Sequence, residues 1–314
     1  MIEMLEPTII ISILIATIRI STPLLLASLG ELITERAGIL NLGVEGGMLM
    51  SSFMGFYATH VTGSLWLGLA TAMLTGAAMN LLMVFMAATL KVEQVVTGLA
   101  LNMMASGLSL YFYKLAFANA KDKIPTISIF PNVEIPFLSQ IPVIGEIFFH
   151  QKLLTYFAFL LVPVVWFFLY RTKFGLEIRC VGENPKVIDS KGLSVPFRQY
   201  SAVLLGGLLI GMGGAFVTIC STVRFIPEIT AGRGWLALVI VIAGNWRPMG
   251  LVAASLIFAF LDAFQLQVQG VGVQIPYQLL LALPYVAAIV LMIIKRRSSQ
   301  EPRCLAVPYF RGER

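Results

Sequence analysis

Long apolar runs separated by short polar segments dominate the sequence. A helix needs about 20 mainly apolar residues to cross the hydrocarbon core of a bilayer, and most of the runs approach that length. They cover residues 8–29, 39–58, 65–90, 95–115, 153–170, 200–221, 235–245, 251–266 and 277–294. The pattern predicts an all-α membrane protein of nine spans, or of eight, because short and broken runs blur the count.

Polar segments between the runs predict the topology of a single domain covering residues 1–314. The segment 119–150 carries four spaced prolines, which exclude a continuous helix there. Residues 171–198 carry six basic and three acidic side chains, and the tail 295–314 is also basic. Excess Lys and Arg beside spans marks the cytoplasmic side, and an even number of spans separates the two basic segments. We therefore expect both in the cytoplasm, with 119–150 outside.

The polar segment 171–198 also carries the signals of a short helix. Asn184 suits an N-cap, Pro185 the first helical position, and Gly192 the end. A short capped helix between two spans suits docking onto a cytoplasmic protein. The residues expected to couple this chain to such a partner are Glu183, Asn184, Pro185, Lys186, Ile188 and Gly192.

Composition supports a membrane protein. Hydrophobic residues make up 58% of the chain and charged residues only 12%, against roughly 25% charged in soluble domains. Mean hydropathy is +0.87. The net charge of +6 does not indicate nucleic acid, because the basic residues cluster where membrane topology places them.

The segment 38–47 places Asn41 and Glu45 among four glycines inside an apolar run. Polar groups at membrane depth are costly and usually face a cavity or a partner, and broken helices line the substrate sites of transporters. We expect Asn41 and Glu45 to line a solute pathway or gate. In the structural alternative, Glu45 pairs with Arg19 or caps a neighbouring helix.

Other residues inside the apolar runs are weaker candidates. Asn102 is expected on the solute pathway, although amides more often bond neighbouring helices, which is the interpretation favoured for Asn80. Trp235 is a candidate for stacking on a ring-shaped solute, against an ordinary interfacial role. Asp262 is expected to pair with a basic group. The small residues of Gly207–Gly211 predict close helix packing.

The sequence lacks the usual marks of an enzyme. Its three cysteines and two histidines have no metal or disulfide spacing. There is no GxxxxGK[ST] loop, so the chain does not hydrolyse ATP by that route, and no catalytic triad pattern appears. We expect a transport subunit without catalytic residues, metal or cofactor of its own.

Three blocks carry a resemblance to a known family. Ile33–Met50, ITERAGILNLGVEGGMLM, resembles the signature of permease subunits in ABC importers of the nucleoside and simple-sugar branch, which is related to branched-chain amino-acid permeases. Gly175–Val195 is similar to that family's cytoplasmic coupling loop, and Gly232–Gly250 matches its third recurrent block. The blocks appear in family order, and the resemblance covers nearly the whole chain.

The resemblance implies a fold and partners. It implies the all-helical fold of vitamin-B12 importers, with a broken helix and a coupling helix within Glu183–Gly192. It implies a second permease, commonly a non-identical sister, two subunits that bind ATP and magnesium, and an extracytoplasmic substrate-binding protein. The form LNLGVEGGM at Leu40–Met48 resembles nucleoside permeases more than ribose-type members, which favours nucleosides.

Other functions remain open at this point. A simple-sugar ABC permease would share the same blocks. An ion-coupled secondary transporter would need embedded carboxylates, for which Glu45 and Asp262 are the candidates, but it leaves the capped helix unexplained. A membrane enzyme is disfavoured by the missing catalytic cluster. The expected location is the inner or plasma membrane.

Overall fold

The fold is taken from a computed structural model, which describes residues 7–118, 125–134, 136, 139, 144–270, 277–295 and 299–311. The longer helices are α1 (Pro7–Arg36), α2 (Val44–Thr62), α3 (Leu65–Val84), α4 (Gln94–Ala116), α6 (Leu153–Arg171), α9 (Val195–Ala215), α11 (Pro248–Gly270) and α12 (Tyr277–Lys295). The shorter elements are η2 (Phe85–Thr89), β1 (Asn132–Glu134), α5 (Ile144–Phe148), β2 (His150–Lys152), α7 (Lys173–Glu183), α8 (Pro185–Ser190), η3 (Phe216–Cys220) and α10 (Arg233–Ala243).

The prediction of an all-α membrane protein is confirmed, whereas the nine predicted runs do not all form full-length spans. Within the described residues, six helical stretches are long and apolar enough to cross a membrane. The remaining runs, at 39–58, 235–245 and 277–294, correspond to α2, α10 and α12. Helix α10 has only 11 residues, which is too short to cross a bilayer alone.

The first helix is longer than its apolar run. The polar stretch 30–38 was expected to separate two spans, but α1 continues to Arg36. Two acidic side chains in this last part are buried and hydrogen-bonded. Glu31 Oε1 accepts from the Asn41 amide at 3.0 Å, and Glu35 accepts from Trp246 Nε1. Because Asn41 and Trp246 donate hydrogen bonds to them, the two carboxylates can be buried without ending the helix.

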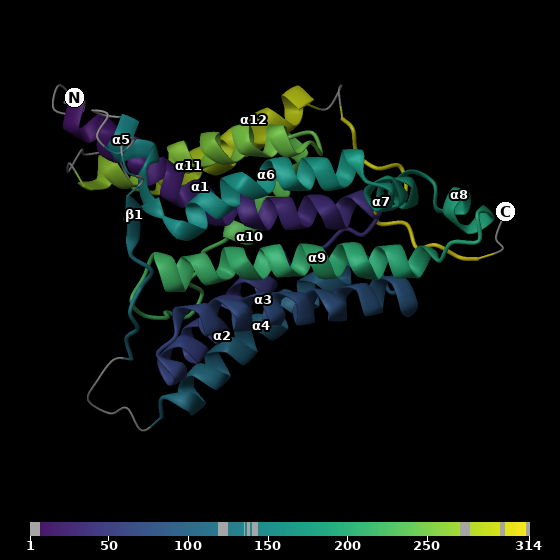
Figure 1. The fold of residues 1–314 in the computed structure, drawn as a ribbon, viewed down its shortest axis with the longest axis horizontal. Helices are drawn as coiled ribbons and strands as arrows, with labels where there is room; N and C mark the ends of the chain where they lie inside the picture. Colours follow the sequence, from purple (N-terminus) through teal and green to yellow (C-terminus); the bar gives the residue numbers. More distant parts are fainter. Residues whose placement is uncertain are drawn as a thin grey trace.

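Helix α9 lies at the centre of the bundle, between a group containing α1, α6, α11 and α12 and a group containing α2, α3 and α4 (Figure 1). The expected close packing at Gly207 and Gly211 is confirmed. A Cβ on Gly207 would lie 2.7 Å from the Gly76 carbonyl of α3, and one on Gly211 would lie 2.8 Å from Met73 Cα. On the other side, Gly206 faces α1, so small residues let α9 contact both groups closely.

The polar segments gather at opposite ends of the bundle (Figure 1). Strands β1 and β2 pair antiparallel, with Asn132 opposite Lys152, and lie with α5 at the end that holds the N-terminus. No continuous helix crosses the described part of 119–150, as expected. The segment 171–198 forms two short helices, α7 and α8, at the other end beside the C-terminus. The segment 171–198 and the described part of the basic tail therefore lie at the same end of the bundle.

Candidate functional site

The break between α1 and α2 is an irregular backbone segment inside the protein. Polar side chains accept hydrogen bonds from its backbone amides. Buried backbone groups need hydrogen-bond partners, especially where no water is present. The Leu40 amide donates to Gln94 Oε1 at 2.7 Å. The Asn41 amide donates to Glu31, and the Gly43 amide donates to Asn41 Oδ1 at 2.9 Å. The break is thus a defined structure.

Three asparagines on three elements hold this break in place. Asn41 is fully buried, and its Nδ2 donates to Asn80 Oδ1 at 3.1 Å. Asn80 Nδ2 in turn donates to a carbonyl of α9. Asn102 on α4 accepts from the Gly46 amide at 2.7 Å and donates to the Leu42 carbonyl at 2.8 Å. Both asparagines outside the break therefore bond neighbouring segments, and Asn102 remains partly exposed.

Glu45 joins the N-termini of α2 and α10. Its Oε1 accepts from Thr230 Oγ1 at 2.5 Å and from the Gly232 amide at 3.0 Å. Its Oε2 accepts from the Gly234 amide at 2.6 Å. A carboxylate at a helix N-terminus satisfies otherwise unpaired amides and complements the helix dipole. The contact is a cap on a neighbouring helix; Arg19 is exposed and is not its partner.

Trp235 lies one residue after this contact, and its side chain is 37% exposed. Among the described residues, its ring packs against no other aromatic ring. Nearby, Ser106 on α4 donates to Glu228, which lies in the link between η3 and α10. Ser106 and Asn102 are one turn apart on α4. Of these groups, Asn102 contacts the helix break directly.

Sequence reasoning missed several members of this site. Gln94, Glu31 and Thr230 bind the break or Glu45, yet each lies in a stretch that looked like a connection between spans. For Glu31, the usable signal was the pair of acids one turn apart in ELITER. Asp262 forms no salt bridge within the described residues.

The short helix α8 forms as its local signals predicted. Asn184 Oδ1 accepts from the Lys186 amide at 3.1 Å, Pro185 occupies the first turn, and Gly192 adopts a φ of 72°. Lys186 and the neighbouring Val187 are exposed, whereas Ile188 is only 3% exposed. Ile188 therefore anchors α8 to its own chain, and the exposed side chains face outward.

The C-terminal segment braces this end of the molecule. The Cys304 amide donates to the Gly182 carbonyl at 2.8 Å, and the Ala306 amide donates to the Gly38 carbonyl at 3.2 Å. Tyr309 packs against the apolar cluster that contains Ile188. Arg311 Nε lies 3.3 Å from Asp189 Oδ1 of α8. The segment thus ties α8, α7 and the start of the helix break together.

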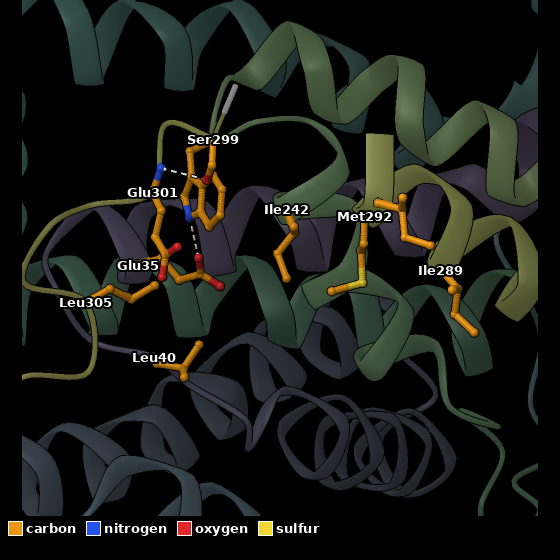
Figure 2. A pocket seen from close by; sticks show the side chains of 10 residues that line it. Glu35, Leu40, Ile242, Ile289, Met292, Ser299, Glu301 and Leu305 are labelled. Carbon is orange, nitrogen blue, oxygen red and sulfur yellow. Dashed lines mark hydrogen bonds between the residues drawn. The ribbon is translucent and has the colours of Figure 1, made fainter. Parts of the chain in front are cut away.

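A cavity of about 640 Å³ lies between the end of α1, α10, α12 and this C-terminal segment. Figure 2 shows mostly apolar walls, with Glu35 and Glu301 among the side chains that line the cavity. Trp246 donates to Glu35 across its wall. Leu40 of the helix break lines the cavity, so the cavity adjoins the break. No group of three or more His, Cys, Asp or Glu is placed for a metal ion in the described parts of the chain.

Comparison with known proteins identifies relatives over nearly the whole length. A family model described as "Branched-chain amino acid transport system / permease component" matches residues 13–294. The guanosine ABC transporter permease NupQ of Bacillus subtilis is 34% identical, with 97% of this chain and 98% of that protein covered. The nucleoside ABC transporter permease NupC of Lactococcus lactis is 32% identical, with 93% and 95% covered.

Two further relatives bear on cargo and assembly. TsgC13 of Haloferax volcanii, provisionally named a glucose ABC transporter permease, is 41% identical, with 82% of this chain and 78% of that protein covered. A second guanosine ABC transporter permease of Bacillus subtilis, NupP, is 26% identical, with 76% and 69% covered. No solved structure matches the chain significantly.

Proposed function

Because the chain belongs to the branched-chain amino acid transport system permease family, within its nucleoside and sugar ABC branch, we propose that it is the membrane subunit of an ATP-driven nucleoside importer. The proposal that the solute is a nucleoside rests on the near full-length similarity to two permeases named for guanosine or nucleosides. A sugar importer is the second candidate, favoured by the 41% identity to TsgC13.

The proposed solute pathway borders the helix break and includes Asn41, Glu45, Asn102 and Trp235. Asn102 and Trp235 are the partly exposed members, and we assign them direct contact with solute. An amide suits the hydroxyl and base edges of a nucleoside, and an indole ring suits stacking on a base. Asn41 and Glu45 are buried and hydrogen-bonded inside the protein, so their proposed role is to hold the gate. Asn102 also makes two hydrogen bonds to the break, but it is partly exposed and keeps a second N–H for a solute.

Glu45 connects the break to α10, so the two elements form one hydrogen-bonded unit. Moving α10 without α2 would break three hydrogen bonds to a single carboxylate. In the proposed gate, α2 and α10 move together between an outward-open and an inward-open arrangement. The solute and the partner subunits shift the balance only through different affinities for those arrangements.

Helix α8 is the proposed coupling helix, placed in the cytoplasm with the C-terminal segment. The exposed residues Asn184 and Lys186, together with Glu183 at the end of α7, would contact an ATP-binding subunit. Ile188 and Gly192 would maintain the shape of α8. ATP and magnesium would bind to that subunit. This arrangement goes with the vitamin-B12-importer type of fold, in which α2, α10 and α12 would complete eight or nine membrane segments.

The proposed assembly also contains a second permease and an extracytoplasmic substrate-binding protein in the inner or plasma membrane. Two guanosine permeases from the same bacterium match this chain at different identities, which supports a non-identical sister.

The test is uptake by the reconstituted assembly. Vesicles containing this chain, its sister permease, the ATP-binding subunit and the substrate-binding protein receive radiolabelled guanosine, uridine or glucose, with ATP on the cytoplasmic face. ATP-dependent uptake of the nucleosides supports the proposal. Uptake of glucose alone supports the second candidate, and uptake driven by an ion gradient without ATP would overturn both.

A further inference from the structure

A second cleft, of about 480 Å³, lies where α6 and α7 meet the turn between α10 and α11. Its lining is unlike that of the cavity in Figure 2, because it contains three arginines and no carboxylate. The lining residues are Arg36, Trp166, Tyr170, Arg179, Arg247, Pro248, Met249 and Gln300. The cleft is at the end of the molecule that holds α8 and the C-terminal segment.

Arg36 has unused hydrogen-bonding capacity in this cleft. Its side chain is 7% exposed; its Nη2 donates to the Trp246 carbonyl at 2.6 Å and to Tyr170 Oη at 3.5 Å. Its Nε is buried without a hydrogen-bond partner among the described residues. A buried charged donor left unpaired is costly, so this group calls for an anionic or polar ligand.

The other two arginines are held in place by their Nε atoms. Arg179 Nε donates to the Leu169 carbonyl at 2.9 Å, and its guanidinium lies 4.7 Å from the centre of the Tyr170 ring. Arg247 Nε donates to Gln300 Oε1 at 2.9 Å. Within the described residues none of the three arginines forms a salt bridge. Guanidinium groups that are not taken up in salt bridges suit oxyanion binding.

The cleft opens at the level where lipid headgroups would lie. Its rim includes Trp166, which is 38% exposed, and Met249, which is 60% exposed. On the same helix as Trp166, Val164 and Phe167 are 51% and 59% exposed, as expected of a face turned towards lipid. Tryptophan at the end of a span is typical of the membrane interface. Basic pockets between helices on the cytoplasmic side bind anionic headgroups.

We propose that this cleft binds the phosphate of an anionic phospholipid, with Arg36, Arg179 and Arg247 as its ligands. The acyl chains would then lie along the outer face of α6. Because α6, α7, α11 and the C-terminal segment all border the site, the bound lipid would hold the base of α7 against the turn that precedes α11. The site is separate from the solute pathway at Asn102.

The test measures binding on the purified full-length chain in mild detergent after lipid removal. Thermal unfolding is followed during titration with phosphatidylglycerol, phosphatidylcholine or inorganic phosphate. Arg179→Gln and Arg247→Gln are compared with wild type. Arg224→Gln is the matched control, since Arg224 is exposed in the link between η3 and α10, outside the cleft lining. Arg36 is left unchanged because it also supports Trp246.

We expect phosphatidylglycerol to raise the melting temperature and phosphatidylcholine to do so much less. Each cleft variant should need about tenfold more phosphatidylglycerol, because one charge-assisted contact is lost, while Arg224→Gln behaves as wild type. Equal protection by inorganic phosphate would show that the cleft binds a free phosphate ion, and the assignment to a phospholipid would be wrong. Protection that is absent, or unchanged by both cleft variants, overturns the proposal. So does loss of ATP-binding-subunit capture in the variants with lipid binding intact, which would assign the arginines to a protein partner.

Discussion

The Gly234 amide donates to the Glu45 carboxylate at 2.6 Å, and a Cβ on Gly234 would stand 2.5 Å from the Glu45 nitrogen. The N-termini of α2 and α10 therefore meet at a distance that only glycine allows. The hydrogen bond between Gly234 and Glu45 and the close packing of the two backbones therefore occur at the same point. The junction that links the helix break to α10 is consequently sensitive to both charge and volume.

Gly234→Ala tests whether the junction between α2 and α10 has room for a side chain at position 234. The added methyl group must push α10 away from α2, and overpacking of this kind costs about 1–3 kcal/mol. We expect a lower melting temperature and reduced uptake. The matched control is Gly107→Ala on α4, where a Cβ would meet nothing within 4 Å. If Gly234→Ala were as stable and active as Gly107→Ala, the close junction would be wrong.

Glu45→Gln tests the charge at nearly constant shape. The amide retains one acceptor oxygen and presents an NH2 group to donors, so at least one buried amide of α10 loses its partner. An unsatisfied buried donor costs about 1–3 kcal/mol. We expect the protein to remain in the membrane with reduced uptake and an unchanged half-saturating concentration of nucleoside. A large change in half-saturation without a change in uptake rate would instead place Glu45 in contact with solute.

The sequence predicted structure well where the determining interactions are local. The capping pattern from Asn184 to Gly192 specified α8, and glycine spacing specified the packing of α9. It failed at the end of α1, because Glu31 and Glu35 look like a polar connection until Asn41 and Trp246 are brought against them. Those partners depend on how distant segments pack, which no local pattern contains.

The same distinction applies to the candidate site. A glycine-rich segment with Asn41 and Glu45 in an apolar run was sufficient to locate the helix break. The partners of Glu45 lie about 185 residues further along the chain, at Thr230 and Gly234. The sequence therefore could not decide between a Glu45 that lines a solute pathway and one that caps a neighbouring helix. In the structure its two oxygens accept from groups at the N-terminal end of α10 and just before it.

Trp235→Ala tests solute contact. The residue is 37% exposed, so much of it is packed against the protein, and the variant should also have a lower melting temperature. Half-saturation is therefore compared on the folded fraction. Stacking of an aromatic side chain on a base contributes about 1–3 kcal/mol, so half-saturation for nucleosides should rise about tenfold or more. Trp235→Phe, which keeps a ring, should recover most of the loss. Equal half-saturation in wild type and Trp235→Ala would remove Trp235 from the pathway.

Val187→Asp tests docking through α8. Val187 is 42% exposed, so a charge there should not disturb the fold of this chain but should oppose an apolar contact with the ATP-binding subunit. We expect normal melting of the isolated chain and weak capture of that subunit in pull-down. Ile188→Pro should also abolish uptake, by breaking α8 itself. Full capture by Val187→Asp would move the docking surface elsewhere.

Tyr309→Ala tests whether the C-terminal segment holds α8 in position. Tyr309 packs against a cluster of Val181, Ile188 and Val195, so removing the ring takes away the apolar cover on the inner face of α8. Helix α8 has only six residues and depends on tertiary contacts for its stability. We expect faster proteolysis within 184–192 and less ATP hydrolysis per nucleoside bound. Tyr309→Phe preserves the packing and is the control. If Tyr309→Ala and Tyr309→Phe show equal protection of α8, the brace must rest on the backbone contacts of Cys304 and Ala306 alone.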